Sequence, residues 1–353
     1  MGPPFIEGES AYFLSINRNR KSITLNLKNE KAREIAYKLT ELSDVAKENF
    51  TPGFSKRLGL DYEALKRVNP KIIYCSISGF GQDRPYRDWP SYDIAIQTMG
   101  GFVSITGEPN RPPVRIGVAV PDMISGMHVV MSILPALRAR ERTGMGQWID
   151  ISRLDSTVSV MTYIAGYYFT IGENPRPAGS SHPTIVPYQG FKCKDGTYLI
   201  VAIGNDTHWE LMCNAAEAVH LLRDLKFTHN ADRVENGSEL IPKLERIFSS
   251  KPREGWFSLL TEVGVPYGPV YAMSEIFTDP HVLHRGMLLE MRHPKAGKAR
   301  LIGNPMKFSE TPVQIKTPPP WLGERTAEVL KNLLGYSDDD ILKLRLEVCP
   351  HAC

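Results

Sequence analysis

The spacing of apolar residues in the first part of the chain predicts helices that lead into buried strands. Apolar side chains recur at helical spacing over residues 29–50 and again over 61–69. The run KIIYCSISGFG (71–81) is β-rich and ends in glycines, and QWIDIS (147–152) has the pattern of a second strand. KSITLNLK (21–28) is predicted to be a strand or an extended stretch. Helix followed by buried strand is the order typical of a parallel α/β sheet.

The pattern changes near residues 172–181, which is the best candidate for a domain boundary. A helical pattern over 155–172 gives way to a cluster of Pro, Gly and Ser, and residues 191–204 then predict a hairpin around an Asp-Gly pair. A proline-rich linker (304–323) leads to a final helical region. Between the hairpin and the linker the spacing predicts three amphipathic helices, over 206–219, 239–248 and 253–263.

Composition narrows the class of protein. The 353 residues are 42% hydrophobic and 23% charged, enough for a sizeable core. The formal charge of +3 comes from 42 basic and 39 acidic residues, so no nucleic-acid partner is indicated. Five scattered cysteines do not predict a disulfide framework. No apolar run approaches the ~18 residues of a membrane span, and the start MGPPFIEGESAYF has neither a signal-peptide core nor an Arg-rich presequence.

Asp122 is the candidate nucleophile. It follows an apolar run and Pro121, and a helix-like pattern begins at once. The simplest interpretation is a helix N-cap, which stabilises a helix start by ~1 kcal/mol. The alternative is chemical: a carboxylate at a helix N-terminus stays ionised, and an ionised carboxylate can attack an activated acyl carbon. The local pattern favours the cap and leaves the chemistry open.

Two glycine-rich segments could line a ligand site. SGFGQ (78–82) follows a strand, and MGGFVSITGEPNRPP (99–113) is dense in glycine and proline, although turn chemistry explains both. Neither matches a dinucleotide or phosphate-loop motif. No metal site is predicted, because His281, His284 and the closing CPHAC match no zinc spacing. Basic residues in the first sixty positions could contact phosphate or simply be solvated: Arg18, Arg20, Lys21, Lys28, Lys56 and Arg57.

Several ordered blocks together resemble the class III CoA-transferases, a family that includes formyl-CoA transferase and α-methylacyl-CoA racemase. The resemblance covers most of the chain. It rests on YFLSINRNRKSITLNLK, VAKENFTPGFSKRLGLDYEALKRVNPKIIYCSISGFGQ, YDIAIQTMGG, TGEPNRPPVRIGVAVPDMISG, RTGMGQWIDISRLDS, GSSHPTIVPYQGFKCKDGTYLIVAIGND and VPYGPV. It implies that Asp122 is the nucleophile, forming an aspartyl anhydride and then an aspartyl-CoA thioester. The implied reaction moves CoA from succinyl-CoA to glutarate, with CoA esters as substrates and no permanently bound cofactor.

The resemblance also assigns binding residues. It places contacts to the adenosine and phosphate end of CoA at Leu25, Lys28, Asn49, Phe50, Arg57 and Leu58. It places the acyl site beside Tyr92, Gly100 and Gly101, with a loop from Gly179 to His182 closing over it. The racemases have a histidine where this chain has Tyr92. Because a tyrosine has an ordinary pKa of ~10, it is a poor proton shuttle at neutral pH, and transferase is favoured over racemase.

The implied fold is α/β, with a Rossmann-like large domain interrupted by a smaller one. We expect residues 1–172 in the large domain, 173–303 in a small α+β domain, and 304–353 in a linker and return to the large domain. The resemblance further implies an interlocked homodimer in the mitochondrial matrix. Compared with the family, the chain is expected to lack the first β-α-β unit and the usual C-terminal ending. A non-catalytic CoA-ester binding or regulatory form is therefore the alternative from another class.

Overall fold

The computed structural model describes residues 2–83 and 85–347, and its chain divides into two compact units. The large unit comprises residues 1–96, 119–160 and 275–353, and the small unit comprises 97–118 and 161–274. The sequence placed domain boundaries after residues 172 and 303. In the structure the corresponding changes of unit come earlier, after residues 160 and 274. The small unit also includes a segment, 97–118, that the sequence pattern assigned to the large domain.

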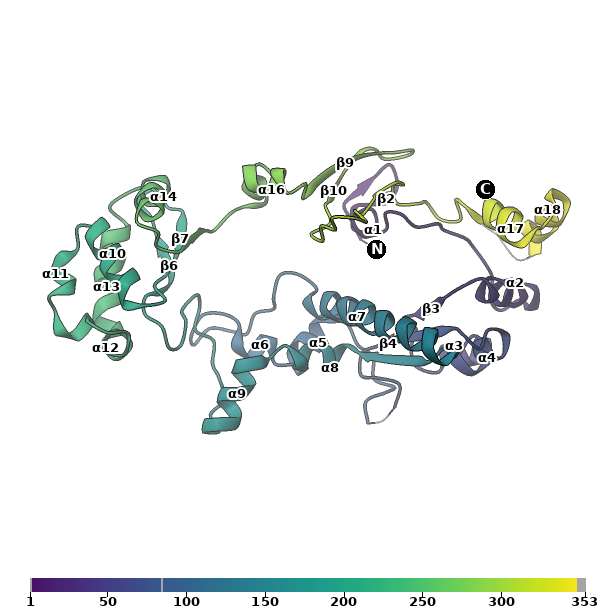
Figure 1. The fold of residues 1–353 in the computed structure, drawn as a ribbon, viewed down its shortest axis with the longest axis horizontal. Coiled ribbons are helices and arrows are strands. Elements are labelled where there is room, and N and C mark those ends of the chain that lie inside the picture. Colours follow the sequence, from purple (N-terminus) through teal and green to yellow (C-terminus); the bar gives the residue numbers. More distant parts are fainter. Residues whose placement is uncertain (1, 84, 348–353) are drawn as a thin grey trace. The chain divides into compact units, whose positions relative to one another are not determined.

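The large unit contains a three-stranded parallel sheet, of which Figure 1 labels β3 and β4. Its strands are β3 (Val45–Glu48), β4 (Ile73–Ser78) and β5 (Trp148–Ser152), in the order β3-β4-β5. Every residue of the central strand β4 is buried, including Ser76 and Ser78, as is typical of a strand covered on both faces. The long helix α7 (Val120–Thr143) packs on the sheet, where Val129 meets Cys75 and Ile77. The predicted α/β class is confirmed.

One predicted helix is shorter than the sequence suggested. The helical spacing over 29–50 extends through two elements, because α2 (Glu30–Glu41) ends early and β3 follows at Val45. The polar pair Ser43-Asp44 separates them, and Val45 pairs in parallel with Ile73. Pairing with a buried neighbouring strand thus overrides local helical spacing. Residues 21–28 form no strand.

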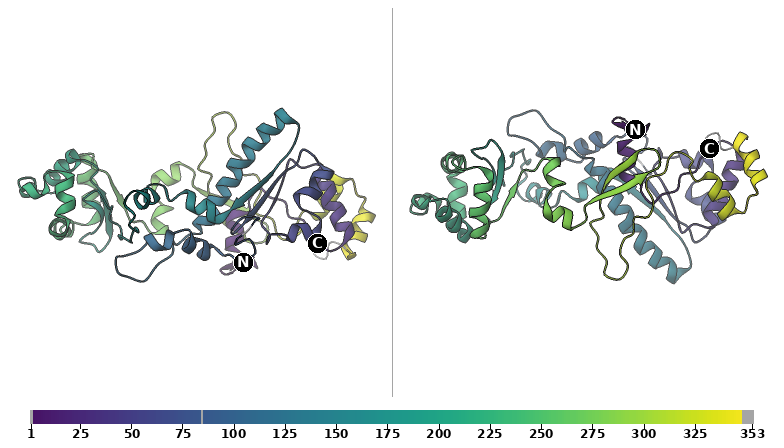
Figure 2. Two further views of the ribbon diagram at one scale, coloured as in Figure 1. Left: turned by 90° about the horizontal axis from the view of Figure 1, so that it is seen from below. Right: turned by 90° about the horizontal axis from the view of Figure 1, so that it is seen from above.

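The C-terminal helices return to the N-terminal part of the large unit. Figures 1 and 2 show α17 (Thr326–Leu334) and α18 (Asp338–Glu347) beside α2. Their shared apolar cluster joins Ala32 and Ile35 of α2 to Leu330, Ile341 and Leu344. Other elements of this unit are α1 (Ala11–Ile16), α3 (Phe54–Leu58), α4 (Tyr62–Val68), α8 (Arg153–Ser159), α15 (Met273–Ile276), α16 (Pro280–His284) and the hairpins β1 (Phe5–Ile6) with β2 (Glu9–Ser10) and β9 (Leu288–His293) with β10 (Gly297–Ile302). Of these, α15 crosses the boundary, because its first two residues belong to the small unit.

The small unit has its own core around an antiparallel sheet, β6 (Tyr188–Lys192), β7 (Tyr198–Ala202) and β8 (Tyr267–Pro269). The predicted hairpin and amphipathic helices are confirmed, with α10 (Asp206–Ala215), α13 (Gly237–Phe248) and α14 (Arg253–Glu262) burying Trp209, Phe248 and Trp256. The helix expected over 155–172 is instead α8 and α9 (Thr162–Ile171), divided where the units meet in sequence. The remaining helices are α6 (Phe102–Ile105), α11 (Val219–Leu222) and α12 (Asn230–Glu235), with α5 (Asp93–Met99) extending across the unit boundary.

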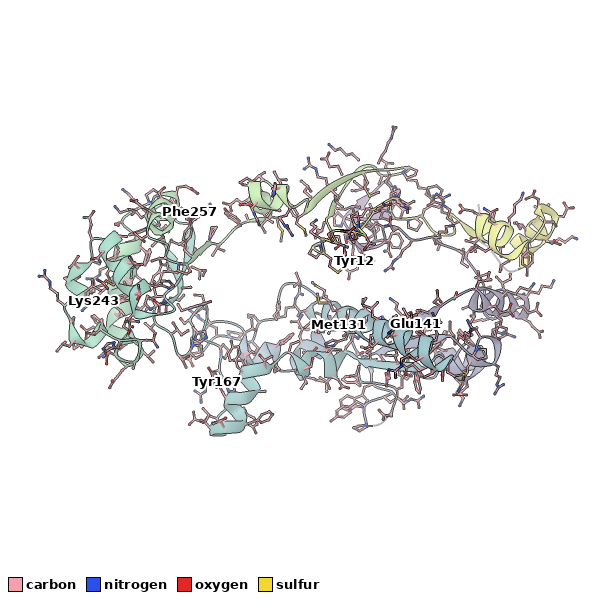
Figure 3. The ribbon with its side chains drawn as sticks, in the orientation of Figure 1. Tyr12, Met131, Glu141, Tyr167, Lys243 and Phe257 are labelled. Atoms are coloured by element: carbon pink, nitrogen blue, oxygen red, sulfur yellow. The ribbon has the colours of Figure 1, made fainter. Side chains whose placement is uncertain are left out.

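Helix α7 is long and apolar enough to cross a membrane by length and composition, which the sequence pattern did not predict. It nevertheless packs on the parallel sheet through Val129 and Ala136, and one residue of its first turn makes an ion pair with α8. Its other side is exposed and apolar, with Met127 and Met131 58% and 65% exposed. Figure 3 labels Met131 and Glu141 along this helix.

Candidate active site

Asp122 lies in the first turn of α7 but does not cap it. The helix begins at Val120, with Ala119 at the N-cap and Pro121 in the first turn. Instead of accepting from a backbone amide, Asp122 Oδ1 accepts a hydrogen bond from Arg153 Nη1 at 2.9 Å. The cap interpretation is therefore wrong. No residue that the structure describes donates to Oδ2, and the side chain is 44% exposed, so one carboxylate oxygen is held while the other is available.

Arg153 is the site residue that sequence reasoning missed. It is the first residue of α8, directly after β5, and Ser152 caps that helix by accepting from the amide of Asp155. Its Nη2 donates to Ser91 Oγ at 2.9 Å and to the Ser91 carbonyl at 3.3 Å, and its side chain is only 14% exposed. The position of Arg153 directly after a predicted strand could have identified it, because ligand sites of α/β sheets lie at the carboxyl ends of the strands.

Gly79 determines where Ser91 lies. A Cβ added at Gly79 would be 2.0 Å from Ser91 Oγ and 2.4 Å from Ser91 Cβ, so only glycine fits. The Gly79 carbonyl also accepts from the amide of Leu154 at 3.0 Å, which joins the end of β4 to the start of α8. A continuous set of contacts therefore leads from Gly79 through Ser91 and Arg153 to Asp122.

Two backbone amides of the SGFGQ segment donate hydrogen bonds within the chain. Gly81, with φ of +92°, donates to Ser78 Oγ at 3.0 Å, and Gln82 donates to Asp150 Oδ2 at 2.9 Å. Burial raises the pKa of Asp150, and the Gln82 hydrogen bond acts in the opposite direction. The positive φ of Gly81 thus serves the turn that follows β4.

The predicted acyl-site residues fall into two groups. Tyr92 is 81% exposed in the large unit and is the chain neighbour of Ser91, so it lies one residue from the partner of Arg153. The second group belongs to the small unit: Gly100, Gly101, Gly179 and His182. Gly101 has a φ of +91°, and a Cβ there would be 3.0 Å from Met161 Cε.

Within the small unit the two predicted loops contact each other. The Gly179 amide donates to the Gly107 carbonyl at 2.8 Å, and a Cβ at Gly179 would be 2.7 Å from Glu108 Oε2. The His182 amide donates to the Tyr188 carbonyl, and its Nδ1 accepts from the Thr184 amide at 3.2 Å. The structure thus brings together residues near 107 and near 179 that the sequence only placed in separate segments.

Only part of the predicted CoA contact set converges. The rings of Phe50 and Phe54 are 5.1 Å apart, and the Arg57 guanidinium lies 5.4 Å from the Phe54 ring. We call these three residues the Phe50 cluster. The structure adds Arg87, whose Nη2 lies 3.0 Å from where a Gly53 Cβ would be. Of the others, Asn49 and Lys28 are exposed, Leu58 is half-buried, and Leu25 packs against the cluster formed by α2, α17 and α18.

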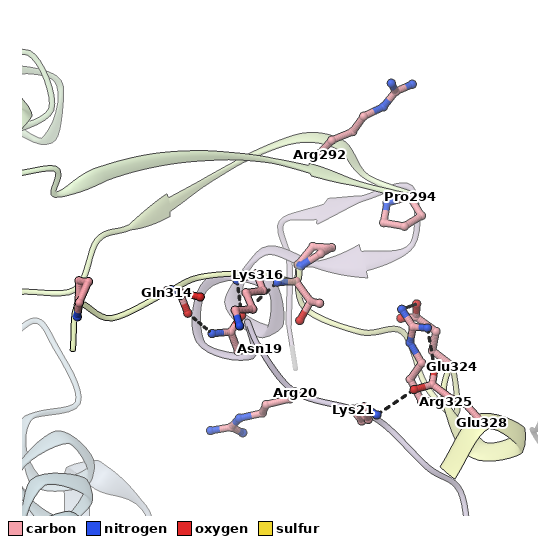
Figure 4. A pocket seen from close by; sticks show the side chains of 13 residues that line it. Asn19, Arg20, Lys21, Arg292, Pro294, Gln314, Lys316, Glu324, Arg325 and Glu328 are labelled. Carbon is pink, nitrogen blue, oxygen red and sulfur yellow. Dashed lines mark hydrogen bonds and ion pairs between the residues drawn. The ribbon is translucent and has the colours of Figure 1, made fainter. Parts of the chain in front are cut away.

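Two cavities of the large unit lie away from Asp122, which lines neither of them. A cavity of about 240 Å³ lies beside the Phe50 cluster and includes Gly53, Lys56, Arg87 and Trp148. A larger one, about 890 Å³, is lined by polar residues of the N-terminal segment and the proline-rich linker (Figure 4). There Lys21 and Arg325 each pair with Glu328 at 2.8 Å, while Arg20, Arg292 and Lys316 also line the cavity, so its lining is net positive. Among the described residues, no group of His, Cys, Asp or Glu side chains could hold a metal. The closing CPHAC segment, considered above as a metal site, is not among the residues that the structure describes.

Known proteins resemble this chain over most of its length. The model of CoA-transferase family III matches residues 1–326. Succinyl-CoA:glutarate CoA-transferase from Mus musculus is 38% identical over 97% of this chain and 78% of its own length, and that from Homo sapiens is 39% identical over the same shares. A crystal structure of a CaiB/BaiF family protein from Brucella suis superposes with a TM-score of 0.85 at 38% identity, covering 94% of this chain and 87% of the other.

Proposed function

Because the chain belongs to CoA-transferase family III, we propose that it moves CoA between dicarboxylic acids, with succinyl-CoA as donor and glutarate as acceptor. The substrates follow from the names of the mouse and human relatives. The observation that carries the proposal to a residue is Asp122, a half-exposed carboxylate with one oxygen held by Arg153 and the other unpaired among the described residues. Such a carboxylate is held in one place and open to attack an acyl carbon.

Asp122 acts as nucleophile in a sequence of acyl exchanges. Its carboxylate attacks the thioester carbonyl of succinyl-CoA, releasing CoA thiolate and forming a mixed anhydride. The thiolate then attacks the aspartyl carbon, which expels succinate and leaves an aspartyl-CoA thioester. Glutarate repeats these steps in reverse order. The thioester energy is retained because one carboxylate replaces another of similar basicity, provided that water is excluded from the intermediate.

CoA binds through its adenosine and phosphate end near the Phe50 cluster. Phe50 is 44% exposed and offers an aromatic face, and Arg57 and Arg87 near Gly53 supply guanidinium groups that suit phosphate. Lys28 and Asn49 are exposed side chains that add a cation and an amide, while Leu25 and Leu58 contribute apolar contact. No step of the reaction requires a metal or a permanently bound cofactor.

The acyl group is expected beside Tyr92 and the glycine segments. The hydrogen bond from the Gly179 amide to the Gly107 carbonyl, at 2.8 Å, supports a defined loop, and the positive φ of Gly101 lets the backbone approach a ligand. Transfer is favoured over racemisation, because the residue before Asp93 is a tyrosine and not the histidine that α-proton exchange uses. Loss of α-deuterium from a 2-methylacyl-CoA would instead support a racemase.

The proposed assembly is a homodimer, in the mitochondrial matrix, with neither nucleic acid nor membrane as partner. The apolar exposed side of α7 supports association, since monomers rarely leave such rows uncovered. The competing function is a binder of CoA esters without turnover. It would be favoured by saturable CoA-ester binding in the absence of any product.

The test is transfer of CoA by purified protein. Parent protein, Asp122→Ala and the control Asp155→Ala are incubated with succinyl-CoA and glutarate, and glutaryl-CoA is followed by mass spectrometry. Asp155 is exposed on the same helix as Arg153, and its side chain plays no part in the proposed site. We expect glutaryl-CoA from the parent and the control and none from Asp122→Ala. Equal rates from all three would remove Asp122 from the chemistry.

A further inference from the structure

Arg153 is a largely buried cation beside the proposed nucleophile, and the proposed reaction gives it no role after the first step. Its ion pair with Asp122 balances the two charges while Asp122 is ionised. That charge disappears each time the aspartyl group is acylated or bonded to CoA. A buried cation without a counter-ion is unfavourable, so a second anion is needed at this point of the cycle.

Contacts other than Asp122 keep the guanidinium in place. Ser91 accepts twice from Nη2, and the absence of a side chain at Gly79 leaves the space that Ser91 fills. Helices α7 and α8 are also joined by a hydrogen bond between His128 Nδ1 and Ser156 Oγ, at 3.0 Å. The position of Arg153 therefore does not depend on the charge of Asp122.

We propose that Arg153 exchanges partners during turnover: it binds Asp122 in the free enzyme and the carboxylate of the acid substrate in the aspartyl-CoA intermediate. This inference rests on the proposed function. A guanidinium is planar and binds carboxylates through paired donors. Arg153 Nη1 donates to Asp122 Oδ1 in the free enzyme, so this donor becomes available to an incoming carboxylate when the aspartyl group loses its charge. Arg153 thereby selects acids as acceptors and aims them at the aspartyl carbon.

The exchange conserves charge at every step. The acceptor carboxylate oxygen attacks the aspartyl carbon, the carbon–sulfur bond breaks, and the electron pair leaves with CoA as thiolate. The thiolate then attacks the acceptor's acyl carbon, and the broken carbon–oxygen bond returns its electron pair to Asp122. Arg153 faces one carboxylate before the step and regains the Asp122 carboxylate after it.

The test separates acid binding from CoA-ester binding. Arg153→Gln removes the cation, Arg153→Lys keeps it without the paired donors, and Arg138→Gln is a matched control at an exposed position of α7. KM for glutarate and for succinyl-CoA are measured separately, and the CoA adduct on the Asp122 peptide is followed by mass spectrometry after glutarate is added. In Arg153→Gln we expect KM for glutarate to rise at least about tenfold, KM for succinyl-CoA to change little, and the adduct to persist.

Each outcome decides the inference. An unchanged KM for glutarate in Arg153→Gln, with the adduct consumed at the parental rate, would overturn it while leaving the proposed function intact. Should Arg153→Gln fail to fold, Arg153→Lys decides: a severalfold rise in KM for glutarate supports partner exchange, and a parental value contradicts it. A parent that forms neither adduct nor glutaryl-CoA would overturn the inference and the proposed function together.

Discussion

At the residue scale, the position of Asp122 depends on Gly79, because the absence of a side chain at this position leaves room for Ser91. Asp122 is held by Arg153, Arg153 by Ser91, and Ser91 occupies the volume where any other residue at position 79 would carry its Cβ. The residues that make these contacts come from different helices, strands and loops. They arise where β4, β5 and α7 converge, which is why local pattern could nominate Asp122 but not its partner.

Gly79→Ala is expected to disturb this arrangement. The added Cβ would lie 2.0 Å from Ser91 Oγ, so Ser91 must move and the Arg153 anchor loosens. Overpacking of this kind costs about 1–3 kcal/mol of stability, and CoA transfer should fall as well. Urea unfolding and the glutaryl-CoA assay measure both effects. The control Gly255→Ala, where the nearest atoms are 3.7 Å away, should lose neither; equal behaviour of the two variants would contradict the packing argument.

At the element scale, the large unit is completed by helices from the far end of the sequence. Helix α2 alone exposes the apolar face that carries Ala32 and Ile35, and α17 covers it through Leu330. The helical spacing of α2 predicted the face, but its partner could not be read from spacing, because contact between distant segments leaves no local pattern.

Leu330→Ala is expected to destabilise the large unit by about 2–5 kcal/mol, because Leu330 is 1% exposed and its removal leaves a cavity. The matched control is Leu333→Ala on the same helix, where the side chain is 53% exposed and the expected change is within about 0.5 kcal/mol. Denaturant unfolding compares the two. Similar losses from both would mean that α17 does not cover α2 through Leu330.

In the small unit, Asp206 connects α10 to α12. It accepts from His229 Nδ1 at 3.0 Å and from the fully buried Arg233 at 2.9 Å. The His229 hydrogen bond, with a smaller contribution from Arg233, lowers the pKa of Asp206. A lowered pKa means that this stabilisation is complete above the ordinary value near ~4 and is lost as the pH falls through the lowered value.

Asp206→Asn should therefore show a pH-dependent difference. The gap in unfolding free energy between parent and variant is expected to be constant above about pH 5 and to shrink as the pH falls below about 4. Urea unfolding across this range measures it. A gap that stays constant down to about pH 3, or one that widens on acidification, would show that Asp206 does not carry the linkage.

At the scale of the whole molecule, the proposed homodimer predicts that the exposed apolar side of α7 is covered. A charge placed there, as in Met127→Glu, should shift the protein from dimer to monomer in sedimentation, because burying it in an interface is costly. Leu42→Glu, at another exposed position (63%), should remain dimeric. A monomeric parent, or recovery of the parent in a membrane fraction, would contradict the prediction.

The sequence by itself determined the α/β class, the buried strand β4, the hairpin of the small unit and the family, because each depends on local spacing or on ordered blocks of residues. It nominated Asp122, Phe50 and Arg57 on the same basis. Only the tertiary structure decided that Asp122 is paired rather than a cap, that β3 replaces the end of a helix, and that Arg153, Ser91 and Gly79 form a chain of contacts to Asp122. These depend on contacts between segments distant in sequence, which spacing within one segment cannot encode.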